Sequence, residues 1–177
     1  GVQRMREADV MWCAVHVGDG NEPGAEALVT KLLSGSPETR VFHLTRSRRK
    51  KFGGQWQTVQ EKLIPGYVFI ETEQPEEVYR ALKKSSGHRL LFGDDDYVTT
   101  LEEQEAEFMG SITDRAGGIG ISRVSVAGKN EVRYLTGPLM RIGHLVKKVD
   151  LHRRIAEVEA DFMGERQTLY LGIEIAE

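Results

Sequence analysis

A change in residue pattern near residue 120 constrains the fold of this chain more than any other feature. Upstream, helical and strand-like patterns follow one another; downstream, only short strand-like patterns and turns occur. Between about Thr113 and Lys129 four glycines interrupt a stretch without periodicity, which is typical of a linker. We therefore expect two domains, at residues 10–113 and 128–177, joined by a linker at 114–127.

The beginning of the first half predicts a strand, a helix and a hairpin. Apolar residues alternate from Met11 to Val17, which indicates a strand that is partly covered on both faces. Asn21 is expected to cap the following helix. Val41–Leu44 opens an extended run through a basic stretch, and Gly53-Gly54 is typical of a two-residue hairpin turn.

Two more helices are expected in this half. Pro75 predicts the start of one, with acidic residues in its first turn and lysines in its last. Leu90–Phe92 predicts a strand, and Thr100 with Glu103 predicts a capping box before another helix. This order of elements favours an α+β domain in which helices cover an antiparallel sheet.

The second half predicts a small all-β domain. Strand-like segments occur at Val132–Leu135, Leu145–Val149, Ala156–Phe162 and Leu169–Ile175, with turns between them. A sheet this small would leave exposed edges if it stayed open, so we expect a compact barrel. The predicted fold class is therefore α+β, with a sheet-and-helix domain followed by a small barrel.

Charge and cysteine content restrict the classes of function. With 24 basic and 27 acidic side chains the net charge is −3, so any contact with nucleic acid must be local. The single cysteine, Cys13, cannot form an internal disulfide, which favours a cytoplasmic location. No apolar run is long enough to span a membrane, and the N-terminal residues do not resemble a signal peptide.

No pattern indicates an enzyme. The run Asp94-Asp95-Asp96 lacks the spaced ligands of a calcium loop and predicts an acidic turn. The sequence shows no nucleophile–base pair, no Cys-x-x-Cys and no phosphate-binding Gly-Lys-Ser/Thr loop. We therefore expect no catalytic residues, no metal and no cofactor.

A first basic block lies in the expected hairpin. It carries five positive charges in six residues. Two interpretations stay open: a solvated strand edge guarded against aggregation, or a finger that contacts phosphates without reading sequence. The residues concerned are Arg46, Arg48, Arg49, Lys50 and Lys51.

A second basic block lies in the predicted barrel, between Arg141 and Arg154. Residues 128–177 contain eight basic and eight acidic side chains, so this domain is neutral but polarised, with acids gathered at Glu157, Glu159 and Asp161. Such sorting favours a phosphate-binding patch over a merely solvated face. The candidate RNA-binding residues are Arg141, His144, Lys147, Lys148, His152, Arg153 and Arg154.

Motifs in both halves resemble the NusG family. Its N-terminal domain opens with a Trp-aromatic-Val-Val strand, here Trp12-Cys13-Ala14-Val15, and contains an aromatic-Pro-Gly-Tyr-Val tract, here Ile64-Pro65-Gly66-Tyr67-Val68. The second half resembles a KOW domain, with Gly137-Pro138-Leu139 followed by Val149-Asp150. The family glycine that comes later in the KOW motif is replaced by His144.

Within this family the second half is most similar to the LoaP-type paralogues, which are antiterminators of long operons. Those sequences carry an Ile-Lys-Lys-Ile-Asp segment, a basic run and a Val-Gly-Leu-Glu-Ile ending. The corresponding segments here are Val146–Asp150, Leu151–Arg154 and Leu171–Ile175. General NusG proteins have acidic residues where Lys147 and Lys148 stand in this chain.

The resemblance implies a monomeric transcription elongation or antitermination factor. The N-terminal domain would bind the β′ clamp helices of RNA polymerase through an exposed apolar depression, and the KOW domain would bind a hairpin in the nascent RNA. The first basic block would lie near DNA at the transcription bubble. The polymerase-binding residues that the resemblance implies are His16, Ile64, Pro65, Tyr67 and Phe69.

Two alternatives stay open. One is a general NusG-type factor whose KOW domain binds a ribosomal protein or a termination factor. The other is a ribosome-associated RNA-binding protein, because KOW domains also occur in ribosomal proteins.

Overall fold

The computed structural model describes residues 10–36, 38–84, 98–129 and 131–176. The chain divides into two compact units. The first contains the residues up to Leu44 together with Ile64–Glu107, and the second contains Thr45–Leu63 together with the residues from Phe108 onward. The hairpin at residues 45–63 therefore belongs to the same unit as the C-terminal strands.

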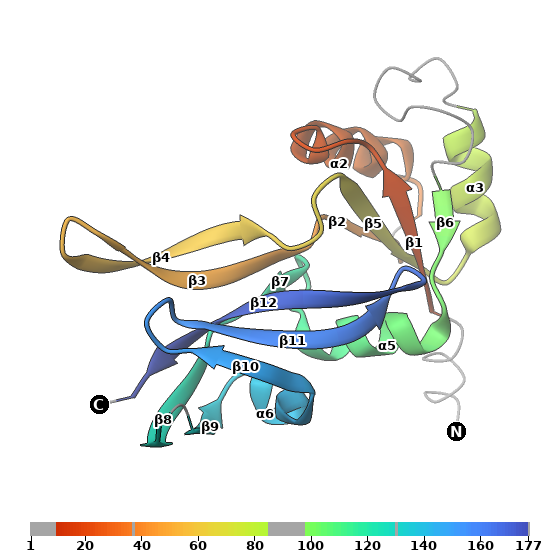
Figure 1. The fold of residues 1–177 in the computed structure, drawn as a ribbon. Coiled ribbons are helices and arrows are strands. Elements are labelled where there is room, and N and C mark those ends of the chain that lie inside the picture. The colour runs from red at the N-terminus through yellow and green to blue at the C-terminus, as the bar shows by residue number, and fades with distance from the viewer. Residues whose placement is uncertain (1–9, 37, 85–97, 130, 177) are drawn as a thin grey trace. The chain divides into compact units, whose positions relative to one another are not determined.

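The first unit is built on a four-stranded antiparallel sheet with the order β2-β5-β1-β6 (Figure 1). Two helices, α2 (Glu22–Leu32) and α3 (Pro75–Lys83), belong to this unit. The strands are β1 (Met11–His16), β2 (Arg40–Phe42), β5 (Tyr67–Thr72) and β6 (Val98–Thr100).

The core of this unit lies between one face of the sheet and the two helices. Alternate residues of β1 and β5 point to this face because side chains in a strand alternate with period two. They pack against the apolar stripes of α2 and α3, which removes these side chains from water and stabilises the unit. The core residues are Cys13, Val15, Val17, Ala25, Val29, Leu33, Val68, Ile70, Val78 and Leu82.

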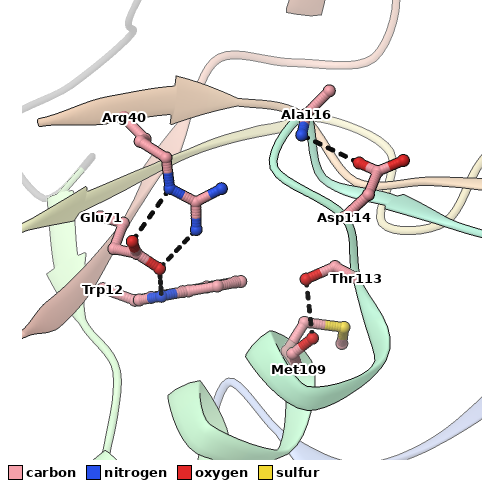
Figure 2. Close-up of polar contacts among 7 residues, drawn as sticks. All are labelled: Trp12, Arg40, Glu71, Met109, Thr113, Asp114 and Ala116. Carbon is pink, nitrogen blue, oxygen red and sulfur yellow. Dashed lines mark hydrogen bonds and ion pairs between the residues drawn. The ribbon is translucent and has the colours of Figure 1, made fainter. Parts of the chain in front are cut away.

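The opposite face of the sheet carries an aromatic cluster. Trp12 and Phe42 pack edge to face with ring centroids 5.0 Å apart, and Phe69 lies 6.3 Å from Phe42. As Figure 2 shows, the Glu71 carboxylate accepts hydrogen bonds from Trp12 Nε1 at 2.8 Å and from Arg40 Nε at 2.9 Å. This network ties β1, β2 and β5 together at one end of the sheet.

The start of α2 differs from the expectation. Asn21 occupies the N-cap position, but its side chain donates to the Val17 carbonyl at 2.8 Å and does not cap the helix. The buried Glu22 carboxylate accepts hydrogen bonds from the backbone amides of Gly20 and Gly66, each at 2.8 Å. Glu22 therefore ties the start of the helix to a turn more than forty residues further along the chain.

The expected capping box at Thr100 and Glu103 is wrong in register. Thr100 ends β6, where its hydroxyl is hydrogen-bonded to that of Tyr79. Helix α5 begins at Glu103 and ends at Ile112, and the Glu105 carboxylate accepts from the Glu102 amide at 3.2 Å. The box is displaced because pairing with β1 holds Thr100 in the sheet.

The second unit contains the expected hairpin. Strands β3 (Thr45–Phe52) and β4 (Gln55–Lys62) pair antiparallel around Gly53-Gly54, both of which have positive φ angles. The short strand β7 (Gly118–Ile119) pairs parallel with β3. The expected single extended run from Val41 onward is instead divided into β2 and β3.

The segment predicted to be a linker, 114–127, contains β7 and most of β8 (Ser122–Gly128). Figure 2 shows the turn that leads into it: the Asp114 carboxylate accepts from the Ala116 amide at 2.8 Å, and Thr113 donates to the Met109 carbonyl at 2.9 Å. Gly117 lies in this turn with a positive φ of 83°, and Gly118 pairs with Thr45 of β3. The predicted start of the second domain, residue 128, is therefore the last residue of β8.

The remaining strands form a five-stranded sheet with the order β10-β11-β12-β8-β9 (Figure 1). All neighbours are antiparallel except β8 and β12, which are parallel. Helix α6 (Leu139–Ile142) and a 3₁₀ turn at Gly143–Leu145 connect β9 to β10. The other strands are β9 (Glu131–Thr136), β10 (Val146–Asp150), β11 (Ile155–Phe162) and β12 (Glu165–Ile175).

The predicted α+β class is confirmed: a sheet with helices is followed by a C-terminal all-β sheet. The four strand patterns of the second half are all strands, and helix α3 begins at Pro75 as expected. The expected strand at Leu90–Phe92 and the acidic turn at Asp94–Asp96 lie outside the described residues.

Candidate functional site

The predicted polymerase face lies where β1 ends and β5 begins. His16 and Tyr67 are direct cross-strand partners with ring centroids 5.0 Å apart. The His16 side chain is exposed, Tyr67 is half-buried, and Pro65 is exposed in the turn before β5. These three residues form an accessible, partly aromatic surface in the first unit.

Two other predicted contacts are not part of an exposed surface. Phe69 is completely buried, and Ile64 is 9% exposed. Phe69 lies on the same face as Tyr67, but its ring packs against Trp12 and Phe42. Ile64 and Phe69 are therefore core residues in this structure, as either could be in a half-buried sheet, and their predicted role in binding polymerase stays a prediction.

The Pro65–Gly66 turn is held in place from several directions. Gly66 adopts a positive φ of 89°, which glycine reaches without steric cost. Its carbonyl accepts from the Val17 amide at 2.8 Å, and its amide donates to Glu22. The turn therefore presents Pro65 and Tyr67 from a fixed backbone.

The first basic block divides between the two faces of β3. Arg46, Arg48 and Lys50 alternate along the strand, and each places a side-chain nitrogen 3.1–3.5 Å from the Glu61 carboxylate on β4. Burial raises the pKa of Glu61, but the hydrogen bond from Arg46 and the three cations outweigh it and lower that pKa below its ordinary value. Three of the five positive charges of the block are thus engaged inside the hairpin.

The other face of the hairpin carries Arg49 and Lys51. Arg49 donates to the Thr58 hydroxyl at 2.9 Å, and the Lys51 ammonium lies 5.8 Å from the centre of the Trp56 ring. Neither residue forms an ion pair with a carboxylate among the residues that the structure describes. This face is therefore the part of the hairpin best suited to phosphate.

The second basic block is spread over several elements. Arg141 lies on α6, and its guanidinium donates to the Ser111 carbonyl at 3.4 Å. His144 is exposed in the 3₁₀ turn, and Lys147 and Lys148 are exposed on β10. Lys148 lies directly opposite Glu157, with Nζ 4.0 Å from the carboxylate.

The acids are less separated from this block than the sequence indicated. Strand β11, which carries Glu157, Glu159 and Asp161, pairs directly with β10. Arg166 on β12 lies 3.5 Å from Glu159 and 3.4 Å from Asp161. The charges are therefore partly compensated across the sheet. Within the described residues, Lys147 on β10 and Arg153 and Arg154 in the loop that follows it form no ion pair with a carboxylate.

That loop, Leu151–Arg154, has a defined conformation. The Arg153 amide donates to the Asp150 carboxylate at 3.0 Å, and Arg154 adopts a positive φ of 57°. The Arg154 carbonyl accepts from the Ile173 amide of β12 at 3.0 Å. His152 and Arg153 are exposed, and Arg154 is half-buried.

The structure brings this loop against the β3–β4 hairpin, a contact that the sequence did not indicate. The Arg154 guanidinium lies over the Trp56 ring, 4.6 Å from its centre. Arg48 is 8% exposed and donates to the Arg153 carbonyl at 3.2 Å. Trp56 was not among the predicted site residues, although an aromatic residue opposite a basic strand is a common signal of nucleic-acid binding.

Comparison with known proteins adds the family. Residues 11–109 match a family model described as "Transcription termination factor nusG". The chain belongs to the NusG family. It is 22% identical over 174 residues to the transcription termination/antitermination protein NusG of Thermus thermophilus, and the match covers 92% of this chain and 95% of that protein.

A solved structure described as "Domain interaction in Thermotoga maritima NusG" is also similar. It is 16% identical, with a TM-score of 0.47, and the match covers 94% of this chain and 95% of that one.

The NusG family consists of transcription factors, which agrees with the expectation that this chain is not an enzyme. The region that matches the family model includes all of the candidate polymerase face and the first basic block.

Among the described residues, no group of three or more His, Cys, Asp or Glu side chains is arranged to hold a metal ion. No helix among the same residues is long and apolar enough to cross a membrane.

Proposed function

We propose that this NusG-family chain is a processive elongation or antitermination factor of the LoaP kind. Residues 10–113 act as the polymerase-binding domain and residues 128–177 as a KOW domain. The segment 114–127 joins the two domains and supplies β7 and most of β8. The observation that carries this proposal is the loop at Leu151–Arg154, where exposed His152 and Arg153 accompany Lys147. Exposed cations on an ordered loop suit contacts with the phosphates of a nascent RNA hairpin.

The polymerase contact rests on the accessible residues His16, Pro65 and Tyr67, with Ile64 and Phe69 supporting them from the interior. An aromatic residue on a fixed turn loses little side-chain entropy on binding, so it can serve as an anchor for an α-helical partner. The partner proposed from the family resemblance is the β′ clamp-helices coiled coil. The factor would act by differential binding, which shifts the polymerase away from pause-prone states.

The polymerase contact is tested with His16→Ala and Tyr67→Ala combined. Both side chains are at least partly accessible, so we expect the fold to remain intact and the affinity for a clamp-helices fragment to fall by more than about tenfold. Tyr170→Ala is the matched control, because Tyr170 is an exposed tyrosine in the second unit. Unchanged affinity in the double variant would refute the proposed contact.

The RNA contact is tested with Lys147→Ala and Arg153→Ala combined in the full chain. The full chain is required because β8, which begins before residue 128, pairs with both β9 and β12. Loss of charged hydrogen bonds worth about 1.5–3 kcal/mol each should weaken binding of a leader RNA hairpin at least about tenfold. Arg166→Ala is the control, since Arg166 faces Glu159 and Asp161.

A second candidate is a KOW domain that binds a ribosomal protein or a termination factor. Three apolar side chains favour it: Val126 on β8, Leu135 on β9 and Met140 on α6 are 47%, 40% and 60% exposed. These side chains lie on three successive elements of the second unit, and a continuous exposed apolar patch can mark a protein interface. Retained RNA affinity in the Lys147/Arg153 variant, together with binding of a protein partner that Met140→Ala weakens, would make this candidate the better one.

A further inference from the structure

The second unit contains a pocket of about 390 Å³ with an almost entirely cationic lining. Six of its eight lining residues are Lys or Arg, and the other two are Trp56 and His152. The lining comes from both basic blocks: β3 and β4 of the hairpin supply one wall, and the Leu151–Arg154 loop supplies the other. No carboxylate of the described residues lines it.

The two walls are held together by close packing. Strand β12 approaches β3 at Gly172, where a Cβ atom would lie 2.9 Å from the Cα of Arg48 and closer still to the Ser47 carbonyl oxygen. Only glycine permits two backbones to approach this closely. Burial of Arg48 and its hydrogen bond to the Arg153 carbonyl add a polar link across the same contact.

Two features of this pocket indicate that it can bind a ligand. The Arg48 Nε is buried and has no hydrogen-bond partner among the described residues, and a buried donor without an acceptor is costly. Trp56 is half-buried, and the Arg154 guanidinium and the Lys51 ammonium lie near its ring. A second hollow of about 250 Å³ beside it is lined by Arg49, Arg154, Ile175 and Glu174, and the Glu174 carboxylate lies 3.4 Å from Arg123. A flat aromatic and guanidinium pair with neighbouring cations matches a base flanked by phosphates.

We propose that this composite pocket binds an unpaired nucleotide in the loop of an RNA hairpin. The base stacks against the Trp56–Arg154 pair, while the flanking phosphates contact Arg49, Lys51 and Arg153. This inference rests on the RNA binding proposed above and adds that the β3–β4 hairpin belongs to the same site. An unpaired loop is required because the bases of a regular duplex are stacked on one another and cannot reach an aromatic platform.

The experiment is a titration of the full chain with a fluorescein-labelled RNA hairpin that has an unpaired loop, at fixed salt. A blunt duplex with the same stem, the loop sequence as single-stranded DNA, and a polyglutamate peptide serve as comparison ligands. The chain has two tryptophans, and Trp12 is 2% exposed, so a base that stacks in the pocket should change the emission of Trp56 alone.

We expect the RNA hairpin to quench tryptophan emission in the wild type and to leave it unchanged in Trp56→Phe, which retains most of the affinity. Trp56→Ala should bind the hairpin about 5- to 100-fold more weakly. Arg49→Ala with Lys51→Ala, which removes hairpin cations without touching Trp56, should also weaken binding. Arg166→Ala should bind like the wild type.

The composite site is refuted if Trp56→Ala and the Arg49/Lys51 variant both bind the RNA hairpin as tightly as the wild type. In that case the proposed RNA binding by the Leu151–Arg154 loop stands. If the wild type binds no RNA hairpin at all, both proposals fall. Equal affinity for the duplex or the polyglutamate peptide would overturn the assignment to an unpaired nucleotide, because the pocket would then select charge alone. Equal affinity for the single-stranded DNA would overturn the assignment to RNA, because the pocket would then accept an unpaired base on either sugar.

Discussion

Replacing Gly172 with alanine tests whether the C-terminal sheet and the β3–β4 hairpin are in fact packed together. The added methyl group would lie 2.9 Å from the Cα of Arg48 and closer to the Ser47 carbonyl oxygen, and both of these are backbone atoms that cannot rotate away. Overpacking of this kind costs about 1–3 kcal/mol. The alanine also restricts the unfolded chain, which offsets about 0.4–1 kcal/mol.

The middle of these two ranges gives a net loss of about 1–2 kcal/mol, which for a chain of this size lowers the Tm by about 2–8 °C. Relief of the overlap would move the hairpin away from β12 and disturb the Arg154–Trp56 stacking. We therefore also expect tryptophan emission to shift to longer wavelength before unfolding begins. Thermal melts followed by circular dichroism, with emission spectra recorded at low temperature, measure both effects.

Gly120→Ala is the matched control for this variant. Gly120 lies in the same unit, and a Cβ there would meet no atom within 4 Å. It should be as stable as the wild type or slightly more so. A Gly172→Ala protein that melts with the wild type and keeps the same emission spectrum would show that the two elements are not in close contact, and the composite pocket would then lose its basis.

Three further outcomes follow from the structure. The pKa of Glu61 is lower in the folded state than its ordinary value of 4.5, so its ion pairs stabilise the protein above pH 4.5 and this stability is lost as the pH falls through the folded-state pKa. Glu61→Gln should therefore be less stable than the wild type at pH 7 and equally stable in strong acid. Urea unfolding midpoints at both pH values measure this. Burial raises the pKa of the Cys13 thiol, against the effect of its hydrogen bonds to Tyr79 and Thr100, so a thiol reagent at pH 8 should react only at the rate of unfolding; rapid labelling of the native protein would contradict this. Gly137 has a φ of 97°, and a Cβ there would lie 2.6 Å from the Cα of Ser122. Gly137→Ala should therefore lower the Tm more than Gly120→Ala does. Equal melting temperatures of the two variants would contradict this.

Several parts of the fold and of the candidate site follow from local sequence patterns alone. Alternation of apolar residues sets the strands of the C-terminal half, since a strand with one covered face must alternate. Pro75 and the charged residues behind it set α3 through the restricted φ of proline and the helix dipole. The two basic blocks and the Pro65–Gly66 turn are likewise evident in the sequence, because each depends on residues that are adjacent in the chain.

Only the tertiary structure decides which of these residues are accessible and which act together. Alternation places Tyr67 and Phe69 on one face, but packing against Trp12 and Phe42 buries the second and leaves the first partly exposed. Local pattern likewise assigned residues 114–127 to a linker, whereas pairing with distant strands makes most of it β7 and β8. The two basic blocks meet because Gly172 lets β12 approach β3, a contact between backbones that are more than one hundred residues apart and that no local periodicity encodes.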